Sequence, residues 1–114
     1  MFQNPKDKVR IQHILEAIHQ IEDYIKNNSY DNFVSNKMLV DATVRQLEVI
    51  GEATNHLSDE IKLHYSNVEW KQIIGLRNIL IHEYFAVDVP LVWSVLQYDL
   101  PEFKNTILEI YSKL

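Results

Sequence analysis

The sequence predicts an all-α protein, an up-and-down bundle of four to five helices. Apolar residues recur at the 3.6-residue period of a helix with one buried face over most of the chain. Its 114 residues include only two glycines and three prolines, too few to supply the turns of a many-stranded β-protein. The length is typical of one domain, so we expect residues 1–114 to form a single helical domain.

The first helix is expected to begin at Asn4-Pro5, because asparagine is a good N-cap and proline suits the first helical position. It should end near residues 27–28. The connector that follows carries two aromatic residues, Tyr30 and Phe33, which we expect to form a single turn packed against the bundle.

The second long helix is expected over residues 37–57, with Gly51 in its interior. Glycine costs about 1 kcal/mol relative to alanine inside a helix. We therefore expect another helix, or another subunit, to approach the backbone closely at Gly51.

Three further starts are predicted by capping residues. Ser58 should begin a short helix through residue 64, and Asn67 should cap a third main helix from residue 68 to about residue 84. Asp88 with Pro90 should begin a last helical stretch. Pro101 is expected to kink or break that stretch before it continues to the C-terminus, because proline cannot donate a backbone hydrogen bond.

Composition limits the function classes. A formal net charge of −5 gives no general attraction to nucleic acid, so any RNA contact must come from a local basic spot. Without cysteine, the chain has no disulfides, thiolate catalysis or cysteine-based zinc sites. The polar N-terminus is unlike a signal peptide, and no apolar stretch approaches the roughly 18 residues that span a membrane. We therefore expect a soluble cytoplasmic protein with no membrane contact.

The predicted helix over residues 68–84 contains an unusual polar cluster. At about 100° per residue, Arg77 lies in the middle of the apolar stripe and requires a partner. That partner could be a carboxylate such as Glu52, a neighbouring subunit or a bound phosphate. His82 lies about 140° from Arg77, on the face of Asn78. The two can converge on one phosphate if the arginine bends, the helix loosens or a second subunit contributes, which favours a site in a homodimer.

Plainer interpretations remain open for the same residues. Arg77 could be a structural ion-pair partner, His82 a capping or exposed group, and Tyr84 an aromatic at the edge of the core. Glu52 and His56 are four residues apart on one helix, but no third metal ligand is evident. We therefore expect no metal site and no cofactor.

Residues 77–84, Arg-Asn-Ile-Leu-Ile-His-Glu-Tyr, resemble the RNase motif of the HepT-like toxins, a branch of the HEPN superfamily. Four residues separate Arg77 from His82, Asn78 follows the arginine directly, and Tyr84 stands two positions after the histidine. Further stretches also resemble that branch: residues 45–55 (Arg-Gln-Leu-Glu-Val-Ile-Gly-Glu-Ala-Thr-Asn), Trp70 with Gly75, Val92-Trp93 and Leu100-Pro101. The resemblance covers nearly the whole chain.

The resemblance implies an α-helical toxin that cleaves RNA without metal, with an active site formed across a homodimer. Arg77 and His82 would be catalytic, and Asn78 would have a supporting role. A second supporting residue would be Glu52, the carboxylate that the helix geometry suggests as a partner of Arg77. The family also implies a partner, a minimal nucleotidyltransferase antitoxin that in some members attaches AMP to the tyrosine matched by Tyr84.

Two other functions stay open at this point. The chain could be a non-catalytic subunit that binds nucleotide or protein and pairs with a nucleotidyltransferase. It could also be a structural helical dimer in which Arg77 is merely buried.

Overall fold

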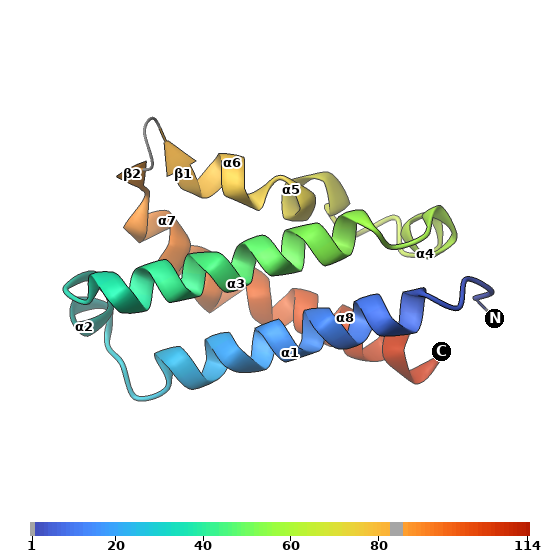
Figure 1. Ribbon diagram of the computed structural model, residues 1–114, viewed down its shortest axis with the longest axis horizontal. Coiled ribbons are helices and arrows are strands. Elements are labelled where there is room, and N and C mark those ends of the chain that lie inside the picture. The colour runs from blue at the N-terminus through green and yellow to red at the C-terminus, as the bar shows by residue number, and fades with distance from the viewer. Residues whose placement is uncertain (1, 83–85) are drawn as a thin grey trace.

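The computed structural model describes residues 2–82 and 86–114, and it confirms the all-α, up-and-down architecture. Its long helices α1 (Asp7–Ile25), α3 (Lys37–Asn55) and α8 (Leu100–Ser112) lie lengthwise in a molecule of 45 × 30 × 21 Å. Figure 1 shows α1 antiparallel to α3, with α8 running in the direction of α3.

The shorter elements connect and flank these helices. They are α2 (Tyr30–Val34), α4 (Asp59–His64), α5 (Trp70–Ile74), α6 (Leu76–Leu80), β1 (Ile81–His82), β2 (Ala86–Val87), α7 (Val89–Ser94) and the π-helical turn η1 (Val95–Asp99). Strands β1 and β2 are antiparallel, with Ile81 opposite Val87 and His82 opposite Ala86. Helices α5 and α6 run back along α3, on the side away from α1 (Figure 1).

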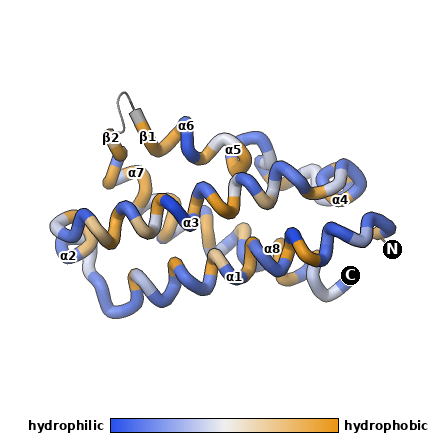
Figure 2. Tube along the Cα trace, viewed as in Figure 1, coloured by the Kyte–Doolittle hydropathy of each residue, from blue (hydrophilic) through white to orange (hydrophobic). Residues whose placement is uncertain are grey.

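The core lies where α1, α3 and α8 face one another. Apolar and polar residues alternate along these helices (Figure 2), and the buried residues of each helix recur with the helical period, so that each helix has one buried side. The fully or almost fully buried side chains include Ile11, Ile14, Ile18, Ile21, Leu47, Ile50, Ile107 and Ile110. Burying each such side chain stabilises the fold by about 1.5–3 kcal/mol, so the core accounts for the spacing of apolar residues.

Several predicted helix starts are confirmed. The Ser58 hydroxyl accepts a hydrogen bond from the backbone N–H of Ile61 at the start of α4. Asp88 caps α7 in the same way, with its carboxylate 3.1 Å from the Leu91 nitrogen. The predicted turn α2 is also present, and its Phe33 is fully buried beside Trp93.

Two predicted starts differ from the structure. The first helix begins at Asp7 rather than Pro5, and the Asn4 side chain instead accepts a hydrogen bond from the Lys6 backbone. The predicted Asn67 cap is wrong, because α5 begins at Trp70. There the indole Nε1 anchors the chain by donating to the carbonyl oxygens of Lys62 (3.2 Å) and Tyr65 (3.0 Å).

The predicted helix over residues 68–84 is also wrong. The chain forms α5, turns at Gly75, forms α6 and then continues extended as β1. Gly75 closes α5 with its N–H and opens α6 with its carbonyl, which accepts from Asn78 and Ile79. Glycine is a weak helix former, and β-branched residues such as Ile81 and Val87 favour extended pairing, so tertiary pairing prevails over the helical spacing.

Pro101 does not break the last helical stretch. Helix α7, the π-helical turn η1 and α8 follow one another without interruption, and Pro101 lies in the first turn of α8. Just before it, the Leu100 N–H bonds to the Val95 carbonyl across the wider π turn. The wider π turn includes Gln97, whose carbonyl would face the Pro101 ring in a regular α-helix.

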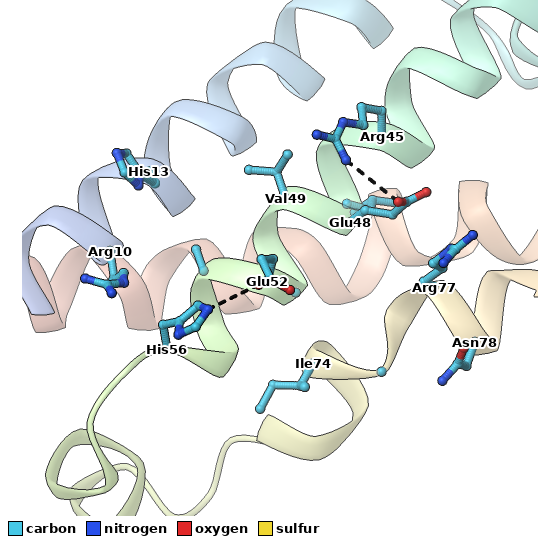
Figure 3. Close-up of a pocket in the computed structure, with 14 residues that line it drawn as sticks. Arg10, His13, Arg45, Glu48, Val49, Glu52, His56, Ile74, Arg77 and Asn78 are labelled. Carbon is cyan, nitrogen blue, oxygen red and sulfur yellow. Dashed lines mark hydrogen bonds and ion pairs between the residues drawn. The ribbon is translucent and has the colours of Figure 1, made fainter.

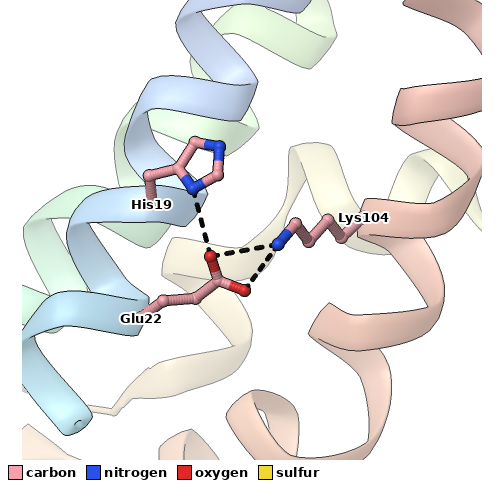
Figure 4. Close-up of polar contacts among 3 residues, drawn as sticks. All are labelled: His19, Glu22 and Lys104. Carbon is pink, nitrogen blue, oxygen red and sulfur yellow. Dashed lines mark hydrogen bonds and ion pairs between the residues drawn. The ribbon is translucent and has the colours of Figure 1, made fainter.

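Two polar contacts tie distant parts of the chain together. Asp7, which is 1% exposed, accepts from the backbone N–H (2.9 Å) and the hydroxyl (2.6 Å) of Ser58. This contact joins the start of α1 to the start of α4. Lys104 on α8 lies 2.8 Å from the carboxylate of Glu22 on α1, and His19 lies 3.2 Å from the same carboxylate (Figure 4). In the part of the chain that is described, no helix is long and apolar enough to span a bilayer.

Candidate active site

The close approach predicted at Gly51 is present. A Cβ atom on Gly51 would lie 3.0 Å from the carbonyl oxygen of Ile73 and 3.2 Å from that of Ile74. The last turn of α5 therefore rests directly on the backbone of α3. Because Gly75 and Arg77 follow this turn, the glycine in α3 fixes where Arg77 lies on the molecule's surface.

The far end of α6 is fixed by a second set of contacts. Leu80 is 1% exposed and anchors the helix in the core. Its carbonyl accepts a hydrogen bond of 2.8 Å from the Asp88 backbone, which holds the start of α7 next to the end of α6. The segment that carries the motif is thus fastened on both sides of Arg77 while Arg77 itself stays outside the core.

An open cavity of about 630 Å³ extends across α3, from α1 on one side to the α5–α6 segment on the other (Figure 3). Its lining residues are Arg10, His13, Arg45, Leu47, Glu48, Val49, Gly51, Glu52, Ala53, His56, Ile74, Gly75, Arg77 and Asn78. Three of the candidate site residues are among them, namely Glu52, Arg77 and Asn78. The volume lies within the range of 300–1,000 Å³ that is usual for ligand pockets.

The expectation that Arg77 lies inside an apolar stripe is wrong. Its side chain is exposed on the cavity, and its guanidinium forms no hydrogen bond or ion pair with any described residue. The 100° rule assumed one continuous helix, whereas the turn at Gly75 changes the direction of the residues after it. Arg77 therefore has its donors available to a ligand or to a second subunit.

One of the possible partners of Arg77, the carboxylate of Glu52, does not pair with it. The Glu52 carboxylate lies 3.1 Å from Nε2 of His56, and Glu48 lies 3.9 Å from the Arg45 guanidinium (Figure 3). Glu52 nevertheless lines the same cavity as Arg77. Its supporting role stays a prediction, and any such role would act across the cavity rather than through a direct ion pair.

The other three motif residues are Asn78, His82 and Tyr84. Asn78 lines the cavity, and its side chain leaves α6 in a different direction from that of Arg77 (Figure 3). The backbone of His82 lies in β1, so the helical four-residue relation expected between Asn78 and His82 does not apply. Tyr84 lies outside the described residues.

The cavity also holds residues that the motif did not point to. Arg10 and His13 reach it from α1, and Arg45 reaches it from α3. Arg10, Arg45 and Arg77 are all the arginines of the sequence. In the sequence, only the small number of arginines set these residues apart. Their spacing along the chain could not show that α1, α3 and α6 place them around one cavity.

Metal-binding geometry is not found among the described residues. No group of three or more potential ligand side chains is present there, and the Glu52–His56 pair has no third ligand among these residues. The cavity lining combines guanidinium, imidazole and amide donors, which bind anions such as phosphate, with the carboxylates of Glu48 and Glu52.

A comparison with known protein families decides the relationship. The model of the family described as "Ribonuclease HepT-like" matches residues 14–110. The chain belongs to the HepT-like ribonuclease family. Nuclease activity is thus indicated at the level of the family, and the matched range includes the cavity residues of α3 and α6 and the Arg77–Tyr84 segment.

Individual relatives carry ribonuclease names. A Methanocaldococcus jannaschii protein named "Gamma-glutamylcyclotransferase and putative RNase" is 42% identical over 107 residues, covering 94% of this chain and 48% of that relative. The chain thus spans about half of that protein's length. A "Putative RNase" of the same organism is 38% identical over 100 residues, covering 88% of this chain and 92% of the relative.

A "Probable ribonuclease HepT" of Thermococcus cleftensis is 33% identical over 95 residues, which covers 83% of this chain and 86% of the relative. No solved structure matches the chain.

Within a HepT-like ribonuclease, the exposed guanidinium of Arg77 is suited to a specific task. A guanidinium keeps its charge and offers two parallel donors that fit two oxygens of one phosphate. In a chain of net charge −5, attraction to RNA depends on where such cationic side chains lie rather than on the whole surface. The same cavity also holds Arg45 toward the end of Arg77 and Arg10 toward the other end (Figure 3).

Proposed function

We propose that this HepT-like chain is the toxin of a toxin–antitoxin system and acts as a metal-independent endoribonuclease, with Arg77 and His82 as catalytic residues at a homodimer interface. The observation that carries the proposal is the Arg77 guanidinium, which is exposed on a cavity and unpaired among the described residues. An arginine that serves to join parts of the fold is usually paired with a carboxylate, whereas both glutamates of the cavity lining contact other residues.

The proposed reaction is an internal transfer within the RNA strand. The ribose 2′-hydroxyl loses its proton to a base, and its oxygen attacks the adjacent phosphorus. The bond from phosphorus to the 5′-oxygen breaks, and that oxygen takes a proton from an acid. The products are a 2′,3′-cyclic phosphate and a 5′-hydroxyl, so atoms and protons balance. The imidazole of His82 is suited to either proton transfer near neutral pH.

Arg77 has the other role in this mechanism. Negative charge builds on the non-bridging phosphate oxygens as the phosphorus becomes five-coordinate. Two guanidinium N–H groups stabilise that charge, and donors placed in this way typically contribute about 10²–10³-fold in rate. Asn78 also lines the cavity, and its amide can donate to the RNA strand at a point other than the phosphate held by Arg77, because the two side chains leave α6 in different directions (Figure 3).

A homodimer would supply both an acid and a base from the motif histidine itself. Each chain has one His82, and one imidazole does not hold and release the two protons at the same moment. A two-fold axis beside β1 and α6 gives one cleft two copies of His82 and of Arg77. In that arrangement one subunit's His82 accepts the 2′-proton and the other subunit's His82 protonates the 5′-oxygen.

The cleavage experiment uses purified protein and labelled RNA, tRNA included, in buffer with EDTA. Wild type is expected to cleave, His82→Ala to lose cleavage, and His19→Ala to keep it. His19 is the matched control because it is an exposed histidine on α1 that contacts Glu22 and lies outside the cavity lining. Absence of cleavage by wild type, with binding of a nucleotidyltransferase retained by His82→Ala, would instead favour a non-catalytic pairing subunit.

The proposal extends to the antitoxin and to Tyr84. A nucleotidyltransferase partner would transfer AMP when the Tyr84 phenol oxygen attacks the α-phosphorus of ATP and pyrophosphate leaves. An adenylate two residues from His82 adds negative charge and bulk at the cleft, which repels RNA phosphate. On co-expression, mass spectrometry is expected to find one adenylate on wild type and none on Tyr84→Phe; an unmodified Tyr84 in an inactive complex would refute modification.

A further inference from the structure

We propose that Arg10 and Arg45 bind further backbone phosphates of the RNA strand that Arg77 holds, so that the cavity is a track for a single RNA strand. The inference rests on the proposed function, because it assumes that RNA is the substrate. It adds a binding role for two residues that lie outside the Arg77–Tyr84 motif, one on α1 and one on α3.

The distribution of cationic residues supports the track. All the arginines of the sequence line this one cavity, and among the described residues no lysine does. Arginine binds phosphate through two parallel N–H groups, whereas lysine acts as a point charge. A chain of net charge −5 thus gathers its bidentate phosphate-binding side chains at one place.

The arginines are available for a ligand. Arg10 makes one long contact, 3.5 Å from Nη1 to the Lys6 carbonyl within its own helix. Arg45 faces Glu48 at 3.9 Å, and its side chain is 71% exposed. Exposed pairs of this kind contribute about 0–1 kcal/mol, so a phosphate can replace them at little cost.

The arrangement of the cavity fits more than one phosphate. Figure 3 shows Arg45 and Arg77 toward one end, with Arg10 and His56 toward the other. Arg45 lies within α3, and His56 is the C-cap residue that ends it. The two are eleven residues apart, which corresponds to about 16 Å along the helix axis. The lining contains three arginines and two glutamates, so its formal charge is positive when the histidines are neutral. The positive charge is concentrated at the arginines.

The test measures RNA binding in a protein that cannot cleave. In the His82→Ala background, the anisotropy of a labelled single-stranded RNA is recorded over a range of salt concentrations. Arg10→Gln with Arg45→Gln is compared with Lys26→Gln and Lys71→Gln, two exposed lysines outside the cavity lining. Both pairs lower the net charge equally, so they separate a site from general attraction. Circular dichroism checks that each variant is folded.

The arginine pair is expected to weaken binding by about tenfold for each residue. It should also lower the slope of log K against log salt by about 0.7 for each phosphate that the variant no longer binds. The lysine pair should change affinity less than about twofold, with an unchanged slope. ATP at equal phosphate concentration should compete far less well than unlabelled RNA.

Three results would overturn the inference: no RNA binding, equal losses in the arginine and lysine pairs, or full competition by ATP, which would make the site one for a mononucleotide. Different results would refute the proposed function, RNA cleavage by this chain. If wild type does not cleave RNA although binding depends on Arg10 and Arg45, catalysis is refuted and the track is supported. If wild type cleaves but the arginine pair binds normally, only the track is refuted.

Discussion

Replacing Gly51 by alanine is expected to weaken the packing of α5 on α3. The new Cβ would lie 3.0 Å from the Ile73 carbonyl oxygen and 3.2 Å from that of Ile74. Ordinary contacts between non-bonded heavy atoms begin near about 3.5 Å. Because both obstacles are backbone atoms, no side chain can rotate away, and α5 must move by a few tenths of an ångström.

The magnitude follows from two opposing effects. Alanine in place of glycine inside a helix stabilises it by about 1 kcal/mol. Overpacking of a tight contact costs about 1–3 kcal/mol. The net expectation for Gly51→Ala is a loss of about 1 kcal/mol, and Gly51→Val should lose more, since it adds two further carbons and a β-branch in a helix.

Urea unfolding at one fixed protein concentration measures this effect, because the stability of an oligomer depends on concentration. The midpoint is expected to fall from wild type to alanine to valine with an unchanged slope. Gln20→Ala on the exposed side of α1 is the control and should stay within about 0.5 kcal/mol. A Gly51→Ala variant that is more stable by the full helix-propensity gain would refute the close approach of α5.

Three further expectations concern named contacts. Arg77→Gln should change the free energy of unfolding by less than about 0.5 kcal/mol, because the side chain is exposed, yet lower the cleavage rate by about 10²–10³-fold; a large loss of stability would contradict this. Asp7→Ala should cost about 2 kcal/mol in urea unfolding, because it leaves the N–H and hydroxyl of Ser58 without their acceptor, and a neutral result would show that water replaces it. A double-mutant cycle of Glu22→Gln and Lys104→Met should give a coupling below about 1 kcal/mol that shrinks with salt, since both side chains are partly exposed; a coupling that is insensitive to salt would indicate a buried pair.

The long helices of the bundle could be predicted from the sequence. Residues 37–57 were expected as a helix and form α3 over Lys37–Asn55, because the apolar spacing matches a helix and no glycine or proline interrupts it except Gly51. That glycine itself predicted a close helix approach, which α5 supplies. A glycine inside a helix makes the helix less stable, and nothing in the neighbouring sequence offsets that loss. Its presence therefore indicates a close packing contact.

The segment around the motif could not be predicted in the same way. Residues such as Ile79, Leu80 and Ile81 fit both a helix and a short strand, because short apolar runs carry no distinctive period. The turn at Gly75 and the pairing of β1 with β2 decide the outcome, and both depend on tertiary contacts. The predicted burial of Arg77 failed for this reason, since it assumed a helix that continues past residue 75.

The arginine-lined cavity also lay beyond sequence reasoning. Arg10 and Arg45 are 35 positions apart in numbering and neither belongs to the motif of residues 77–84. They line one cavity only because α1 and α3 pack side by side and α6 runs along α3. The residues of the motif were identifiable from their pattern, whereas the cavity that surrounds Arg77 is a property of the packing.

Two copies of His82, one from each subunit, are proposed to serve a single RNA cleavage site. The direct test is to refold a fixed amount of wild type with increasing His82→Ala and to measure RNA cleavage in EDTA. With a ninefold excess of the variant, only about a tenth of wild-type subunits find a wild-type partner, so the rate should fall about tenfold. A rate that stays constant as the variant is added would show that each subunit acts alone and would contradict the shared site.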